Sequence, residues 1–215
     1  MSCLLMGRGR TLLLVTLGLG LAGPLWAQAS LGVNLGYSRS SFVGSDSKGV
    51  SAREGAVAGA YFRLPLTSWL SVQPELQLAS KGGASRVTAG NPPVPLRLEL
   101  DLVYLDLPVL LRAGVPVPGG TRLVLLAGAT PGVRIGCNVE FFQNGVSIQR
   151  NTCGAVNLAT IRDWDVAVVG GAGLAVPIER SELALEVRYS RGFHSVSDLG
   201  DIRNSAISFT LAIPF

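Results

Sequence analysis

The chain has 215 residues, enough for one ordinary domain, and only 15% of them are charged where about 25% is usual. No stretch contains the roughly 20 consecutive apolar residues of a membrane-spanning helix, so a chain this apolar can cross a membrane only with strands. Two of the 18 basic residues lie near the N-terminus, and the remaining 16 nearly balance the 14 acidic residues, which gives no support for a nucleic-acid partner.

The N-terminal segment has the order of a secretory signal peptide. Two arginines precede an apolar run from Thr11 to Ala22, which is too short to anchor the chain in a membrane. A small-x-small sequence then ends at Ala29. We therefore predict that residues 1–29 are removed by cleavage between Ala29 and Ser30. One exported domain, residues 30–215, remains.

After the signal peptide, apolar and polar residues alternate with a period of two, which indicates strands. Eight strands are predicted, at residues 30–38, 55–64, 69–80, 96–112, 121–136, 163–176, 182–191 and 205–215. Short turns join them near residues 65–68, 113–120 and 177–181, and long polar loops join them near residues 39–54, 81–95, 137–162 and 192–204. This pattern predicts an all-β fold, an eight-stranded antiparallel transmembrane β-barrel with an up-and-down meander.

Alternation does not say which face of the barrel is apolar. A soluble lipocalin-like barrel has its apolar face inside, and a membrane barrel has it outside. Aromatic residues favour the membrane barrel because they fall at two levels, with Tyr37, Trp164 and Tyr189 near the long loops and Trp69, Tyr104 and Phe215 near the short turns. The polar face then lines the lumen, where we predict a charge network of Arg63, Glu75, Arg97, Glu99, Asp101, Arg134, Glu186 and Arg188. Eight strands leave room mainly for side chains, so this network is expected to plug the barrel.

The last strand, SAISFTLAIPF (205–215), is an alternating row whose apolar side is expected to face lipid. A final strand that ends in Phe215 resembles the assembly signal that barrel-assembly machinery reads in bacterial outer-membrane proteins. We therefore expect a location in the bacterial outer membrane. The expected partners are outer-membrane lipid and, during insertion, this machinery.

Four stretches share strand patterns with fixed turn residues: SVQPELQLASKGG (71–83), VYLDLPVLLRAG (103–114), VVGGAGLAVPI (168–178) and LALEVRYSRGF (183–193). In this order and spacing they resemble the PorT-like outer-membrane β-barrel family. The resemblance implies an eight-stranded antiparallel barrel, and Asp106 stands where the family's YLEIP pattern has a glutamate. It offers no functional residue to match, so the secretion and gliding role attached to the family name is not carried over.

Two cysteines, Cys137 and Cys153, fall in the longest predicted loop of the exported chain. In an oxidising compartment pairing is the default, and closing a loop of about 15 residues would restrict it by about 3 kcal/mol. The loop contains no histidine, so a disulfide is favoured over a metal site.

His194 is the only histidine, and Ser195, Asp198 and Asp201 follow it closely. Serine, histidine and an acid could make a hydrolase at the outer rim. The lipid deacylase barrels have histidine and serine two positions apart on a lipid-facing strand, whereas here they are adjacent in a polar loop. A solvated loop is therefore the favoured interpretation.

The stretch GGAGLA (170–175) has the glycines of a phosphate-binding loop but lacks its lysine and the following helix. We interpret it as a strand that lets a bulky neighbour pack close. For the whole chain we expect a non-enzymatic, monomeric barrel without a cofactor, with a structural or surface-binding role through its extracellular loops. A rim hydrolase around His194 and a soluble periplasmic lipocalin-like binder are the alternatives, and the sequence names no surface ligand.

Overall fold

The computed structural model describes residues 29–154, 161–178, 181–198 and 200–215. Ten strands form one antiparallel sheet: β1 (Ser30–Val43), β2 (Arg53–Pro65), β3 (Leu70–Ala89), β4 (Val94–Asp106), β5 (Val109–Pro116), β6 (Arg122–Gln143), β7 (Val146–Thr152), β8 (Trp164–Ile178), β9 (Ser181–Gly192) and β10 (Arg203–Pro214). Within these described ranges, no helix is long and apolar enough to cross a membrane. The predicted signal peptide lies outside them except for Ala29, which directly precedes β1.

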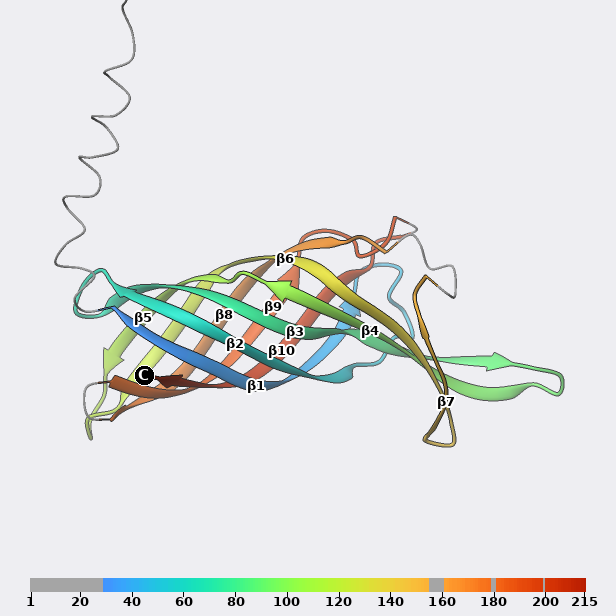
Figure 1. Cartoon of the computed structure of the whole chain (residues 1–215), viewed down its shortest axis with the longest axis horizontal. Helices are drawn as coiled ribbons and strands as arrows, with labels where there is room; N and C mark the ends of the chain where they lie inside the picture. The colour runs from blue at the N-terminus through green and yellow to red at the C-terminus, as the bar shows by residue number, and fades with distance from the viewer. Residues whose placement is uncertain (1–28, 155–160, 179–180, 199) are drawn as a thin grey trace, which may run out of the picture.

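The sheet closes into a ring with eight strand positions (Figure 1). β1 pairs with β2 on one side and with β10 on the other, so the first and last strands close the ring. β4 and β5 share one position because both pair with β3 and with β6. β7 adds to the edge of β6 beyond the end of β8. The predicted eight-stranded antiparallel meander is confirmed.

The predicted strand 96–112 is divided into β4 and β5 at Leu107 and Pro108. Pro108 has no N–H to donate to the ladder, but its carbonyl accepts from the N–H of Glu75 at 2.8 Å. The N–H of Leu107 donates to the carbonyl of Pro131 at 2.8 Å. The proline therefore interrupts the regular ladder while both halves stay in the barrel wall.

The end of the barrel with the long connections is the outer end, because outer-membrane barrels have short turns on the periplasmic side. At this end, two hairpins extend well beyond the predicted strands (Figure 1). β3 and β4 continue into the predicted loop 81–95, and β6 and β7 occupy part of the predicted loop 137–162. The β6–β7 hairpin turns at Asn144 and Gly145, which have φ angles of 51° and 82°. Two consecutive positive φ angles are the geometry of a type I′ turn, and Asn-Gly is its preferred sequence. Both hairpins therefore have regular local structure where loops were expected.

The two faces of the barrel wall differ in polarity. Leu35, Leu76, Leu78 and Leu185 point outward and are 48–61% exposed. Residues at alternate positions, such as Gln73, point inward and are buried. An apolar outer surface of this kind costs about 1.5–3 kcal/mol for each large side chain left in water and is favourable in lipid. A soluble lipocalin-like barrel needs the opposite arrangement, so this alternative is wrong.

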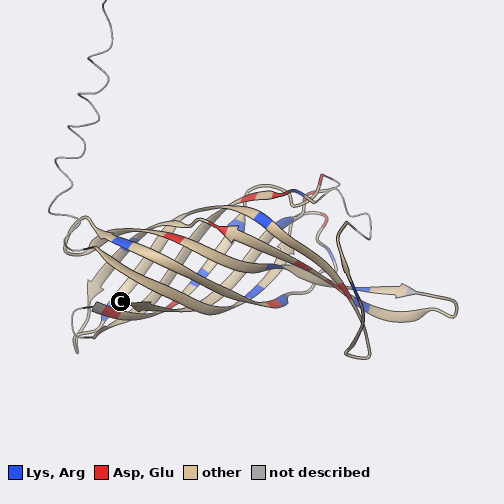
Figure 2. Cartoon of the chain, in the orientation of Figure 1, with Lys and Arg blue, Asp and Glu red and all other residues tan. Residues whose placement is uncertain are grey.

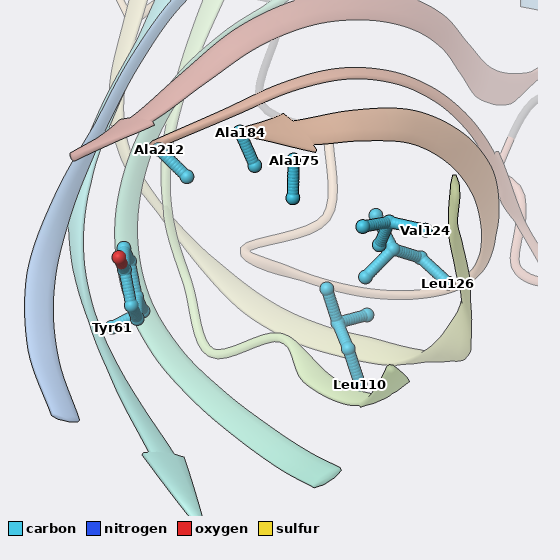
Figure 3. Packing of buried hydrophobic residues seen from close by; sticks show 7 residues of the cluster. All are labelled: Tyr61, Leu110, Val124, Leu126, Ala175, Ala184 and Ala212. Carbon is cyan, nitrogen blue, oxygen red and sulfur yellow. The ribbon is translucent and has the colours of Figure 1, made fainter. Parts of the chain in front are cut away.

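A small apolar cluster packs inside the barrel toward the short turns, the end that faces the periplasm in outer-membrane barrels (Figure 3). Tyr61 and Leu110 are its largest members, and the full cluster is Tyr61, Leu110, Val124, Leu126, Ala175, Ala184 and Ala212. Three alanines leave the room that the larger side chains fill. Charged side chains of the interior lie on both sides of this cluster, toward the centre of the barrel and toward the short turns.

Candidate functional site

The centre of the barrel is closed by one guanidinium held between two carboxylates. Arg188 on β9 donates to both carboxylate oxygens of Glu75 on β3, at 2.8 and 2.9 Å. Its Nε and Nη2 also donate to Glu186, at 3.0 and 2.7 Å. All three residues are at most 5% exposed. A buried set of charges persists only when each charge is paired and hydrogen-bonded, so this central plug is a sensitive part of the fold.

Amide side chains extend the central plug across the lumen. Asn34 and Gln73 each donate to Glu75 at 2.7 Å. The Oε1 of Gln73 accepts from Nε of Arg63 at 2.8 Å. The plug therefore joins side chains from β1, β2, β3 and β9, and hydrogen bonds cross the barrel between strands that are not neighbours in the wall.

A second polar layer lies above the plug. Lys81 binds Asp106 at 2.8 Å, and its Nζ lies 4.5 Å from the ring centroid of Tyr104. Asn204 donates to Asp165 at 2.9 Å. A cavity of about 40 Å³ between the two layers has room for water-sized molecules only. Lys81 is absent from the predicted network, although even spacing from Glu75 along β3 would have placed it inside.

Four of the eight residues of the predicted lumen network line this interior: Arg63, Glu75, Glu186 and Arg188. Figure 2 shows charged residues distributed along the strands of the barrel. Arg97, Glu99 and Asp101 do not belong to the network. They alternate along β4 with Leu102 and Tyr104, which are 0% and 1% exposed. Tyr104 is therefore an interior residue and does not belong to the predicted aromatic girdle.

The reason for this reversal lies in the hairpin that β4 forms with β3. Beyond the lipid-facing belt, the outer surface meets water, so charged side chains take the outer face and apolar side chains fill the inside. Asp101 and Glu99 bind Arg53 at 3.0 and 3.4 Å. On the other face, Leu98 and Leu100 line an apolar cleft of about 210 Å³.

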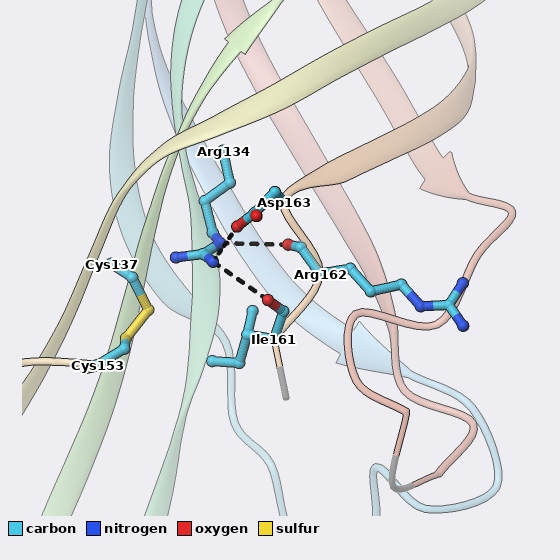
Figure 4. Close-up of a disulfide and its surroundings, with 6 residues drawn as sticks. All are labelled: Arg134, Cys137, Cys153, Ile161, Arg162 and Asp163. Atoms are coloured by element: carbon cyan, nitrogen blue, oxygen red, sulfur yellow. Dashed lines mark hydrogen bonds and ion pairs between the residues drawn. A yellow bond between two sulfur atoms is a disulfide. The ribbon is translucent and has the colours of Figure 1, made fainter. Parts of the chain in front are cut away.

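Arg134 lies at the outer mouth and is separate from the central plug (Figure 4). Its Nη2 donates to the carboxylate of Asp163 and to the carbonyl of Ile161, the latter at 3.1 Å. Its Nε donates to the carbonyl of Arg162 at 3.2 Å. Arg134 therefore fastens the segment that enters β8 to the wall of the barrel.

Cys137 and Cys153 form the predicted disulfide (Figure 4), with their Cα atoms 5.5 Å apart. Cys137 lies on strand β6 and not in a loop, and Cys153 directly follows β7. The N–H of Cys153 also donates to the carbonyl of Cys137 at 3.2 Å. The bond therefore closes the base of the β6–β7 hairpin. In the described part of the chain, no three His, Cys, Asp or Glu residues group as metal ligands.

Reduction of this disulfide should loosen the β6–β7 hairpin and leave the barrel folded. The oxidised protein should be two hydrogens lighter than the reduced protein, and reduction should remove about 3 kcal/mol of restraint from the hairpin. Hydrogen exchange should accelerate in β7 and stay slow in β9, which serves as an internal control, and Cys153→Ser should behave like the reduced protein. Free thiols that react with an alkylating reagent in the folded, non-reduced protein would contradict the assignment.

A groove of about 560 Å³ lies where the two outer hairpins meet. Its lining combines charged and apolar side chains: Arg86, Pro95, Leu96, Arg97, Glu99, Phe142, Asn144 and Gly145. Arg86 and Arg97 are direct partners in the β3–β4 ladder, and Arg97 is also the partner of Phe142 in the β4–β6 ladder. Two guanidinium groups therefore stand beside one aromatic ring.

Most of the chain matches a known protein family. Residues 26–198 match the family described as the outer membrane protein beta-barrel domain. The chain belongs to this family. A closed barrel with an apolar outer face agrees with this membership, and the bacterial outer membrane is the location of the barrel.

Several solved structures of outer-membrane proteins are similar to this chain in fold. Ail, the attachment invasion locus protein of Yersinia pestis, is 14% identical, with 87% of this chain and 99% of that chain covered and a TM-score of 0.44. Neisserial surface protein A is 10% identical, with 87% and 99% covered and a TM-score of 0.48. The outer membrane enzyme PagL is 10% identical, with 85% and 99% covered and a TM-score of 0.37. Nothing about function follows from likenesses at this level, and no curated protein matches the chain.

The loop of the outer-membrane barrel around His194 does not assemble a serine, histidine and acid. The His194 ring lies 4.6 Å from the ring of Trp164, and its Nδ1 has no hydrogen-bond partner among the described residues. The hydroxyl of Ser195 is hydrogen-bonded to the backbone of its own loop. Asp198 is bound by Arg162 at 2.7 Å. Asp201, the other acid of this loop, is bound by Arg203 at 2.7 Å, so both acids are paired with arginines.

The other end of the outer-membrane barrel holds Phe215. Its N–H donates to the carbonyl of Leu31 at 2.9 Å, and the residue is 81% exposed. The side chain is thus free to contact lipid at the periplasmic rim. Its role as an assembly signal stays a prediction.

Proposed function

We propose that the protein is a non-enzymatic outer-membrane barrel whose extracellular hairpins bind phosphorylated saccharides of the cell surface. The closed interior supports this proposal because it directs any interaction with large molecules to the outer end. The observation that carries it is the groove between the two hairpins, in which Arg86 and Arg97 stand opposite each other beside Phe142.

Like charges directly opposite each other on paired strands are unfavourable unless a counter-charge lies between them. Glu99 binds Arg97 at 2.8 Å. Arg86 is exposed and has no ion pair with any described residue. A phosphate group in the groove would receive charge-assisted hydrogen bonds from both guanidinium groups. The ring of Phe142 offers an apolar surface for the C–H face of a sugar.

The test uses the barrel in nanodiscs and a soluble probe, the phosphorylated core oligosaccharide of lipopolysaccharide freed of its lipid. Replacing both groove arginines, Arg86→Ser with Arg97→Ser, should weaken binding by about tenfold or more, because two hydrogen bonds to a charged group are lost. Arg150→Ser is the matched control, since Arg150 is an exposed cation of the β6–β7 hairpin that does not line the groove. Equal binding by the double variant and the control would refute the proposal.

We further propose that the chain is a PorT-like member of its family, on the basis of the four strand motifs at residues 71–83, 103–114, 168–178 and 183–193. No secretion or gliding role is part of this proposal. It includes export with cleavage between Ala29 and Ser30, a monomeric barrel without a cofactor, and recognition of Phe215 by barrel-assembly machinery.

A further inference from the structure

Three arginines converge on one carboxylate at the periplasmic mouth of the barrel. Glu182, at the start of β9, accepts from Arg122 at 2.9 Å and from Arg112 at 3.2 Å. Nη1 of Arg63 lies 3.8 Å from the same carboxylate. A single carboxylate cannot neutralise three guanidinium groups, so this mouth has an excess of positive charge.

The acids deeper in the barrel do not remove this excess. Glu75 and Glu186 are both held by Arg188 in the central plug. Nε of Arg112 lies 3.8 Å from Glu186, which is too far for a hydrogen bond. The lower interior thus contains four arginines, Arg63, Arg112, Arg122 and Arg188, against three glutamates, Glu75, Glu182 and Glu186.

Several guanidinium donors at this mouth are also unused. Arg112 and Arg63 are only 4% and 8% exposed. Within the described ranges, no acceptor lies in hydrogen-bond reach of Nη2 of Arg63, of Nε and Nη2 of Arg112, or of Nε of Arg122. Buried donors without an acceptor are costly, and the cost is larger for charged groups. Glu182 therefore satisfies only part of the guanidinium donors at this mouth, and a second anionic acceptor would match the remaining ones.

The three arginines surround a pocket of about 100 Å³. Part of its lining comes from the short β2–β3 turn, including Thr67, Ser68 and Trp69, so the pocket lies at the periplasmic rim. Trp69 is 55% exposed, as expected for an aromatic residue at the level of lipid headgroups. The pocket is therefore within reach of solutes in the periplasm and of headgroups in the inner leaflet.

We propose that this pocket binds a phosphate group from the periplasmic side, held by Arg63, Arg112 and Arg122. The planar fork of a guanidinium matches the spacing of two phosphate oxygens, and three forks around one pocket supply the donors that the protein leaves unused. Phosphate has the size and the negative charge that the pocket requires. The group comes from inorganic phosphate or from the headgroup of a phospholipid. This proposal is independent of the saccharide groove at the other end of the barrel.

Two probes separate these sources in binding measurements on the purified barrel in a non-ionic, phosphate-free detergent. Inorganic phosphate tests the free anion, and dihexanoyl phosphatidylglycerol tests the lipid headgroup. Arg112→Gln should weaken binding of the effective probe by about tenfold or more, since charge-assisted hydrogen bonds are lost. Glu182→Gln should strengthen binding, because it removes the carboxylate that competes with phosphate for the same donors. Arg203→Gln, a change of a partly exposed arginine at the outer end, is the matched control and should bind as the unaltered barrel does.

Heat-modifiable migration on gels confirms that each variant is folded before binding is measured. The proposal is supported if one probe binds, Arg112→Gln weakens this binding and Glu182→Gln strengthens it. The probe that binds then identifies the source of the phosphate. Absence of binding by the unaltered barrel to both probes at millimolar concentration overturns it. If Arg112→Gln does not fold, the direction of the Glu182→Gln effect decides, because an affinity that falls or stays constant in that variant also overturns the proposal.

Discussion

Replacing Arg188 by methionine should lower the free energy of unfolding of the barrel by about 3–5 kcal/mol, the cost of breaking a buried ion pair by removing one partner. The change leaves Glu75 and Glu186 buried at 2% and 0% exposure without the cation that both now bind. Methionine fills part of the space but offers no hydrogen-bond donor. Urea unfolding of the barrel in detergent micelles, followed by tryptophan fluorescence, measures the loss.

Two comparisons separate this charge effect from a loss of packing. Adding Glu75→Gln and Glu186→Gln to Arg188→Met should restore most of the stability, because the two buried carboxylates that lose Arg188 are then neutral. Arg162→Met removes an arginine from an exposed pair with Asp198 and should cost less than about 1 kcal/mol. Equal losses in Arg188→Met and Arg162→Met would show that the central plug does not contribute as we infer.

The barrel itself could be predicted because its wall repeats one simple rule. Along β3, Leu76 and Leu78 face lipid while Glu75 and Gln77 face the lumen, and this alternation is visible in the sequence. The strand count followed from the alternation and from the contrast between short and long connections. Where the wall has lipid on its outer side and a packed lumen on its inner side, the period of two tells which residues face lipid and which face the lumen.

The same rule failed on β4 because alternation alone does not say which face is outside. Asp101 and Leu102 alternate as Glu75 and Leu76 do, but the apolar member of the β4 pair is the buried one. The difference comes from height above the membrane, which depends on how far the β3–β4 hairpin extends. The height of a β4 residue above the membrane is known only once the strand pairing and the tilt of the closed barrel are known.

Two boundary signals were present in the sequence and could have been used. Asn144 and Gly145 form the strongest short hairpin signal, and they mark the turn between β6 and β7. Pro108 marks the division of one long predicted strand into β4 and β5. Asn144 and Gly145 lie within the predicted loop 137–162, and Pro108 lies within the predicted strand 96–112.

The candidate sites were harder to predict than the wall. Arg63, Arg112 and Glu182 come from three different strands, and only the tilt and stagger of the closed barrel bring them to one mouth. Alternation could place each of them inside, but it gives no height along the barrel axis. The sequence could therefore suggest which charges share the lumen, and it could not say which of them meet.

Substitution of Gly173 by alanine should destabilise the barrel by about 1–3 kcal/mol, because it overpacks a filled interior. Gly173 belongs to the stretch GGAGLA, interpreted from the sequence as a strand that lets a bulky neighbour pack close. A Cβ at this position would overlap the backbone carbonyl of Leu185 and lie 2.9 Å from the Cα and Cγ of Glu186. The backbone of β9 cannot yield without disturbing its ladder with β8, so the strain would reach the carboxylate that Arg188 holds.

Gly170→Ala is the matched control in the same strand and the same stretch. A Cβ at Gly170 would meet no atom within 4 Å, and this position is exposed on the outer face of β8. Alanine there should leave the stability unchanged or raise it by about 0.4–1 kcal/mol, because it restricts the unfolded chain. Urea unfolding of both variants gives the comparison. A Gly173→Ala barrel as stable as the Gly170→Ala barrel would mean that the close approach of β8 to Glu186 is not needed for the central plug, whereas a loss confined to Gly173→Ala would tie the glycines of β8 directly to the buried charges of β9.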